Sequence, residues 1–126
     1  MSDKPVKIPG PDHPITVEPS ALRVTATVAG RTIADSTSTL ELNEAGYPTV
    51  HYFPRADVEM GLLEPTDHAT YCPYKGDAAY FSITTDDGAV DNAVWTYEHP
   101  YDAVADIKDH VAFYPDRVEV TAQPAG

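Results

Sequence analysis

The sequence contains a single cysteine, Cys72, among its 126 residues. One cysteine excludes an internal disulfide and any zinc or iron–sulfur site built from several cysteines. The other common donors, His51, His68, His99 and His110, are not paired at the close spacing of zinc ligands. We therefore predict no metal site, and nothing in the sequence specifies a cofactor.

Positive charge is also scarce, with 8 basic residues against 20 acidic ones and a net charge of -12. This balance repels nucleic acid and anionic membranes, so we expect neither as a partner. No apolar run approaches the roughly 20 residues that cross a bilayer. The first residues, MSDKPVKIPGPDHP, lack the apolar core of a signal peptide. These observations predict a soluble, cytoplasmic protein with a reduced thiol.

Proline is abundant only at the start, where five of the 12 prolines fall within the first 20 residues. Because proline blocks both helix formation and strand pairing, we predict an extended arm over residues 1–20. The following residues, 21–121, are expected to form one β domain, and residues 122–126 a frayed tail.

Most of the predicted domain alternates between apolar and polar residues. In residues 22–28, LRVTATV, every second residue is apolar, which is typical of a half-buried strand. Ala29-Gly30-Arg31 then predicts a tight turn, and Asp86-Asp87-Gly88 predicts the tip of a second hairpin. Acidic residues are ordinary at such a tip, so Asp86 and Asp87 need no catalytic role.

One segment, residues 101–110, follows a proline and favours a short helix, with Val104 and Ile107 facing the core. Seven or eight strands with no βαβ alternation exclude a Rossmann sheet or a TIM barrel. We predict a mainly β protein: a small antiparallel sheet, partly closed like a barrel or folded like a tent, with one short helix near 101–109.

Four blocks of sequence carry a family resemblance: HYFPRADV at 51–58, TYCPYKGDAAYFSI at 70–83, NAVWTYEHPY at 92–101 and HVAFYPDRVEV at 110–120. Together they resemble the bacterial and fungal domain-of-unknown-function family numbered 427, over about Leu22 to Val120. The resemblance implies a small β protein. The family's label of nucleotidyltransferase domain also implies nucleotidyl transfer, which normally uses carboxylates that hold Mg²⁺.

The motif Cys72-Pro73-Tyr74-Lys75-Gly76 is the first candidate site. Lys75 and Arg55 would favour the thiolate of Cys72 by Coulomb attraction, and a thiolate is the reactive form. The alternative is a buried cysteine that packs as a small hydrophobic residue beside a turn.

His51 and Arg55 lie at the end of a predicted strand, and Arg117 lies near the end of the domain. His51 is the best available general base, or it faces water. Arg55 either grips an anion or pairs locally with Asp57 or Glu59. Arg117 either joins Arg55 and Lys75 as a third cation or pairs locally with Asp116.

Aromatic residues supply the last candidates, because the chain has eight tyrosines and one tryptophan. Tyr74, Trp95 and Tyr97 could form a wall on which a flat ligand stacks, or they pack as ordinary core. Val94 and Trp95 lie on opposite faces of one strand, so one of them is expected to border a second layer or a cavity.

We therefore expect a pocket for a small molecule that is anionic or flat. Arg55, Lys75 and Arg117 would hold its charge, and Tyr74, Trp95 and Tyr97 would form its wall. In an enzyme, Cys72 would be the nucleophile and His51 the base. The alternatives are a non-catalytic protein–protein interaction module and a thiol-dependent or nucleotidyl-transfer enzyme.

Overall fold

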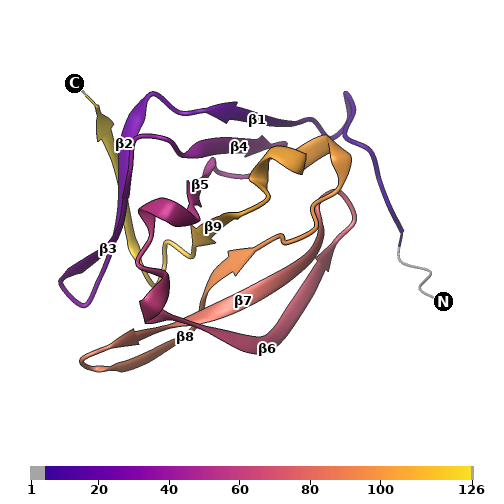
Figure 1. Cartoon of the computed structure of the whole chain (residues 1–126). Helices are drawn as coiled ribbons and strands as arrows, with labels where there is room; N and C mark the ends of the chain where they lie inside the picture. The colour runs from indigo at the N-terminus through magenta and orange to yellow at the C-terminus, as the bar shows by residue number, and fades with distance from the viewer. Residues whose placement is uncertain (1–4, 126) are drawn as a thin grey trace.

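The computed structural model describes residues 5–125; the first four residues of the predicted arm and the last of the predicted tail lie outside this range. The described chain is built from antiparallel strands joined by short turns (Figure 1). The strands are β1 (Ile15–Pro19), β2 (Leu22–Val28), β3 (Arg31–Ser36), β4 (Leu40–Glu44), β5 (Val50–Pro54), β6 (Leu63–Cys72), β7 (Gly76–Thr85), β8 (Gly88–Thr96), β9 (His110–Phe113) and β10 (Glu119–Pro124).

The strands form two sheets. Seven are ordered β1-β4-β5-β9-β8-β7-β6, and three are ordered β10-β2-β3. The larger sheet curls without closing, so that β1 and β4 lie over the half formed by β6, β7 and β8 (Figure 1). The prediction of a mainly β, partly closed or tent-like antiparallel fold is confirmed.

The central strands of the larger sheet contribute to two cores, one on each face, because neighbouring residues of a strand point to opposite sides. On β5, Phe53 packs with Val24 and Ile33 of the three-stranded sheet. Its neighbour Tyr52 packs on the other face with Tyr97 and other residues of a second cluster. The same alternation puts Val94 in the first core and Trp95 against the second, as the sequence predicted.

Both predicted hairpin turns are present. β2 and β3 are joined by Ala29 and Gly30, which have φ angles of 51° and 76°. Two successive residues with positive φ give the turn whose twist matches that of antiparallel strands. Asp86 and Asp87 join β7 to β8 just before Gly88.

The predicted helix is a kinked 3-10 segment, η3 (Asp102–Ile107), in which Val104 has non-helical angles of φ -128° and ψ 26°. Six residues are too few to support an α-helix on their own. Val104 and Ile107 are nevertheless buried as expected. Two shorter 3-10 turns, η1 (Arg55–Asp57) and η2 (Met60–Leu62), connect β5 to β6. None of the helices in residues 5–125 has the length and apolar character that crossing a bilayer requires.

The structure extends the paired region beyond the boundaries expected from the sequence. Residues 15–19, part of the predicted arm, form β1 and pair with β4. Residues 122–124, part of the predicted tail, pair with β2 as the end of β10. Pro19 and Pro124 each end an outer strand, where a missing N–H costs least.

Strand β6 has no counterpart among the strands expected from the sequence. It is ten residues long, contains Pro65, and its pairing with β7 shifts between Pro65 and Ala69. Proline, polar residues and a bulge hide the alternation that would mark a strand. The fold tolerates them because β6 is the edge of the larger sheet.

Candidate functional site

A cavity of about 750 Å³ lies against the second core, on the face of the larger sheet that carries Tyr52. Aromatic side chains dominate its wall: Tyr47, Tyr52, Tyr80, Trp95, Tyr97, Phe113 and Tyr114. The polar side chains that line it include Glu44, His51, Cys72 and Lys75. A largely apolar cavity with few polar groups is typical of a small-molecule site.

Five of the eight residues singled out from the sequence line this cavity: His51, Cys72, Lys75, Trp95 and Tyr97. They come from β5, the end of β6, the β6–β7 turn, β8 and the residue just after β8. The curl of the sheet brings these elements together, since β5 and β7 are not neighbours in the strand order.

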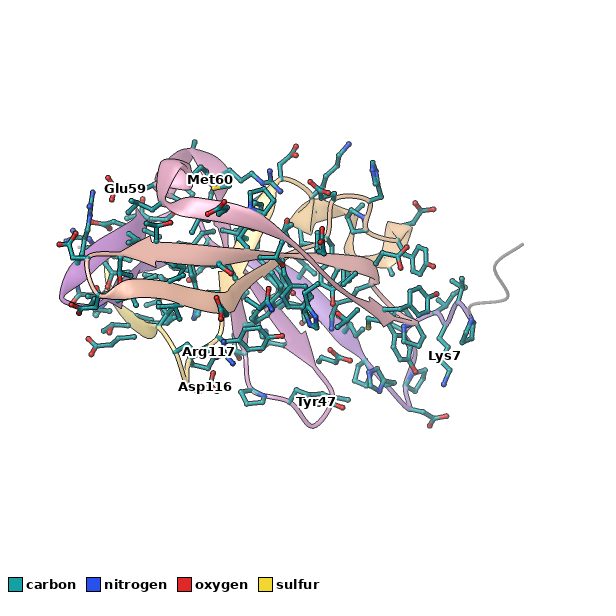
Figure 2. All side chains as sticks on the ribbon, turned by 90° about the horizontal axis from the view of Figure 1, so that it is seen from below. Lys7, Tyr47, Glu59, Met60, Asp116 and Arg117 are labelled. Carbon is teal, nitrogen blue, oxygen red and sulfur yellow. The ribbon has the colours of Figure 1, made fainter. Side chains whose placement is uncertain are left out.

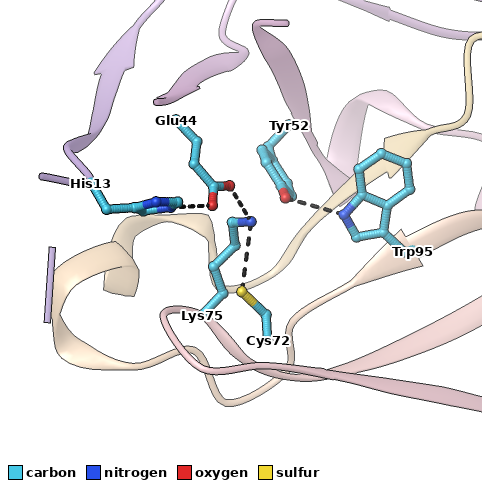
Figure 3. Close-up of polar contacts among 6 residues, drawn as sticks. All are labelled: His13, Glu44, Tyr52, Cys72, Lys75 and Trp95. Carbon is cyan, nitrogen blue, oxygen red and sulfur yellow. Dashed lines mark hydrogen bonds and ion pairs between the residues drawn. The ribbon is translucent and has the colours of Figure 1, made fainter. Parts of the chain in front are cut away.

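Lys75 is the cation of the cavity, and its side chain is only 13% exposed. Its Nζ donates to Glu44 Oε1 at 2.7 Å and approaches Cys72 Sγ at 3.9 Å (Figure 3). The Glu44 carboxylate also lies 2.7 Å from His13 Nε2 through its other oxygen. Burial by itself raises the pKa of Glu44, but the hydrogen bonds from Lys75 and His13 outweigh it and lower that pKa. Glu44 is therefore ionised at neutral pH.

The residue Tyr74 faces the N-terminal segment. Its ring stacks on His13, with centroids 4.2 Å apart and planes 7° apart. The same segment is fixed to the β6–β7 turn by the Lys7 N–H, which donates to the Pro73 carbonyl at 2.9 Å. Tyr74 thus helps to hold His13 against Glu44 and is not among the residues that line the cavity.

His51 lies at the cavity wall on β5, with its Nδ1 3.4 Å from Thr39 Oγ1. Burial lowers the pKa of His51, and the nearby Glu41 only partly opposes this effect. The imidazole is therefore neutral at pH 7 and can accept a proton, as a general base must.

Trp95 and Tyr52 form a rigid corner of the aromatic wall. The Trp95 indole N–H donates to the Tyr52 hydroxyl at 3.1 Å, and the two rings meet edge to face (Figure 3). Trp95 also packs on Tyr114, with ring centroids 4.5 Å apart. These contacts fix the indole in the cavity wall, so a ligand that packs on it would cost little further side-chain freedom.

Two tyrosine hydroxyls at the cavity have hydrogen-bonding capacity that the described residues do not use. Tyr97 is 7% exposed, and within residues 5–125 its hydroxyl has no hydrogen-bond partner. Tyr52 is 1% exposed; its oxygen accepts from Trp95, but its O–H meets no acceptor in the same part of the chain. Burial raises the pKa of both phenols, so both stay protonated and can donate.

Arg55 and Arg117 lie apart from Lys75. Arg55 contacts Thr96 Oγ1 at 3.3 Å and Glu98 at 3.7 Å, and its guanidinium lies 5.7 Å from the centre of the Phe81 ring. Its sequence neighbours have other partners: Asp57 accepts from Ser36, and Glu59 pairs with Arg31.

Arg117 donates to the carbonyl of Asp91 and lines a second, smaller cavity of about 370 Å³. It follows Asp116 in the loop before β10, at a distance from Lys7 and the N-terminal segment (Figure 2). The three cations that the sequence suggested therefore do not converge on one cavity; Lys75 alone of the three lines the larger one.

Sequence reasoning missed Glu44, His13 and Tyr52 as parts of this site. Tyr52 lies inside the block HYFPRADV, so it could have been noticed there. Glu44 ends β4 and His13 lies in a proline-rich segment, and neither carries a local signal. Their importance arises from contacts between distant segments: Glu44 accepts from Lys75, and His13 contacts Glu44, each pair being 31 residues apart in the sequence.

The cavity does not suit the Mg²⁺ that nucleotidyl transfer normally uses. Glu44 is the one carboxylate among its lining residues, and both of its oxygens are engaged by Lys75 and His13. Within residues 5–125, no three side chains of His, Cys, Asp or Glu gather as a metal site requires. We therefore assign no step to a metal ion.

The fold and the cavity define a small antiparallel β domain with an aromatic-lined cavity. The family model described as "Domain of unknown function (DUF427)", and named NTP_transf_9, matches residues 16–124. The chain therefore belongs to this family, as the four sequence blocks indicated. None of the curated proteins matches the chain.

Proposed function

We propose that the 750 Å³ cavity binds a small, flat, mainly apolar molecule that carries a hydrogen-bond-accepting oxygen. The observation that carries this proposal is the pair of hydroxyls on the buried residues Tyr52 and Tyr97, which line the cavity and have no acceptor among the described residues. A hydrogen bond to a ligand contributes about 0.5–1.5 kcal/mol. A ligand oxygen that accepts from these hydroxyls would gain about that much affinity from each.

The aromatic rings that line the cavity favour a flat ligand. Trp95 and Tyr114 are already held in fixed positions by their mutual contact, so they offer faces for stacking without further ordering. A strongly charged anion is less well served, because Lys75 is already bound by Glu44 at 2.7 Å. The oxygen is that of a carbonyl or a carboxylate, and the experiment below separates the two.

The alternative of a protein–protein interaction module is less favoured by the same geometry. Aromatic residues that bind a partner protein have to be exposed at the surface of the free protein. Four of the rings that line the cavity, Tyr52, Tyr80, Tyr97 and Phe113, are less than a tenth exposed, and Tyr47 is the strongly exposed one, at 66%. A cavity rather than a flat surface is what these residues form.

The test uses four probes and the fluorescence of Trp95, which is the chain's only tryptophan. Acetophenone is flat with a carbonyl, benzoate is flat with a carboxylate, isopropylbenzene has a similar shape without oxygen, and inorganic phosphate is an anion without a ring. We expect acetophenone or benzoate to bind at least about tenfold more tightly than isopropylbenzene, since one good hydrogen bond contributes about 1.4 kcal/mol. Phosphate should not bind.

Tyr97→Phe is the variant that tests the hydroxyl, and Tyr101→Phe is its matched control. The Tyr101 hydroxyl bonds to Tyr71 and is not among the cavity residues. We expect Tyr97→Phe to weaken the oxygenated probes about fivefold to tenfold and Tyr101→Phe to leave them unchanged. If no flat oxygenated probe changes the fluorescence or the melting temperature, the proposal is wrong.

A further inference from the structure

We propose that Cys72 captures flat conjugated ketones or aldehydes by adding its sulfur to their carbon–carbon double bond, while Tyr52 and Tyr97 hold the carbonyl oxygen. This inference rests on the proposed function, because the same cavity holds the molecule. It adds a covalent step and names the chemical class of the substrate.

The nucleophile is placed for this reaction at the end of β6. Cys72 is half-buried and its side chain lines the cavity. Lys75 Nζ lies 3.9 Å from its sulfur, and Cys72 and Lys75 are joined by a tight turn in which the Lys75 N–H donates to the Cys72 carbonyl. Figure 3 shows the Cys72 sulfur, the Lys75 amine and the Tyr52 hydroxyl pointing toward the same space.

An independent observation points to the carbonyl oxygen. Tyr97 is more than nine-tenths buried, lines the same cavity, and offers an O–H with no acceptor in residues 5–125. Lys75 Nζ lies 6.0 Å from the centre of its ring. Phenol donors aimed at an oxygen stabilise the negative charge that develops there when a nucleophile adds to a conjugated system.

The step balances without any further reagent. The Cys72 sulfur forms a bond to the β-carbon as the carbon–carbon π bond breaks, and its electron pair moves onto the carbonyl oxygen as an enolate. The Tyr52 and Tyr97 O–H groups hold that oxygen. The proton that leaves the sulfur passes through the adjacent Lys75–Glu44 pair to the α-carbon. The product is a thioether with the carbonyl restored.

This class of substrate fits the cavity better than other electrophiles. Hydrolysis of an ester or an amide would need an activated water molecule and a departing group, whereas addition to a conjugated carbonyl needs neither. A conjugated carbonyl needs no oxidant and loses no group. It is also flat, as the aromatic wall requires.

The experiment compares two ketones that differ by one double bond: benzalacetone, which is conjugated, and benzylacetone, which is saturated. Intact-protein mass spectrometry follows the adduct on the full chain, and iodoacetamide serves as a reference reagent that places little charge on its carbonyl oxygen. We expect benzalacetone to add once to the wild-type protein and not to Cys72→Ser. Benzylacetone should bind without adding.

The decisive comparison is between Tyr97→Phe and Tyr101→Phe. We expect Tyr97→Phe to slow benzalacetone addition about tenfold. This loss of rate is smaller than that usually caused by removing an oxyanion-hole donor, because the Tyr52 hydroxyl still contacts the oxygen. Its rate with iodoacetamide should change less than about twofold.

An equal slowing with both reagents, an adduct that persists in Cys72→Ser, or no adduct at all would overturn the inference. If benzylacetone binds but benzalacetone does not add, the covalent step fails while the proposed function stands; if neither binds and the oxygenated probes also fail, both are wrong.

Discussion

Glu44 is the residue on which the polar side of the cavity depends. It accepts from Lys75 through one oxygen and from His13 through the other, and it is only 12% exposed. Without Glu44, the Lys75 ammonium would be left in a largely apolar cavity with no carboxylate beside it. Removal of one partner of a buried ion pair is costly for this reason.

We expect Glu44→Gln to lower the free energy of unfolding by about 2–3 kcal/mol near neutral pH, somewhat less than for a fully buried pair. Because the folded protein lowers the pKa of Glu44, its contribution is complete above the ordinary value of 4.5 and is lost as the pH falls through the folded-state value. The difference between wild type and variant should therefore shrink below about pH 4.5. Urea unfolding at a series of pH values measures it.

The matched control is Glu41→Gln, on the same strand and without an ion pair among the described residues. It should change the free energy of unfolding by less than about 0.5 kcal/mol. A Glu44→Gln effect that does not depend on pH would mean that the side chain acts through packing and not through its charge.

At the scale of elements, the turn between β6 and β7 determines where Cys72 and Lys75 point. Gly76 opens β7 with φ 111°, a conformation that other residues rarely adopt. A β-carbon there would lie 3.3 Å from the carbonyl oxygen of His99, in the segment that leads to η3. The Tyr101 N–H donates to the Lys75 carbonyl, so this segment and the turn are held together.

We expect Gly76→Ala to destabilise the protein by about 2–3 kcal/mol, from backbone strain and from the close approach together. Gly88→Ala is the control, because Gly88 has nearly the same φ of 114° but nothing within 4 Å of an added β-carbon. Gly88→Ala should therefore show only the cost of strain, about 1 kcal/mol. Equal losses in thermal melts of the two variants would contradict a role for the contact with His99.

At the scale of the whole molecule, a net charge of -12 acts on every element at once. Like charges repel one another in the compact state, and salt screens this repulsion over about 10 Å at 0.1 M. Several ion pairs, such as Arg23–Asp35 and Arg31–Glu59, lie at the surface, where each contributes little. Repulsion should therefore outweigh these local attractions.

We expect the melting temperature to rise by several degrees between about 10 mM and about 500 mM sodium chloride. Scanning calorimetry at fixed pH measures the change, and chloride avoids the general stabilising effect of sulfate. A melting temperature that falls with salt would mean that the ion pairs, including Lys75–Glu44, dominate over net repulsion.

From the amino-acid sequence alone one can predict the strands with regular alternation, the two hairpin turns and five residues that line the cavity. Alternation has a period of two that shows directly in residues such as Leu22 to Val28, and turns depend on local backbone preferences. His51, Cys72, Lys75, Trp95 and Tyr97 stood out because their chemistry is visible in the residue type.

Which of these residues meet depends on how the chain folds in three dimensions. The curl of the larger sheet brings Glu44 to Lys75 and His13 to Glu44, while it leaves Arg55 and Arg117 elsewhere. Strand β6 and the pairing of β1 and β10 also depend on distant partners and not on local pattern. Contacts between residues far apart in the chain leave no periodic signal, so a single sequence specifies the parts of this site but not how they are assembled.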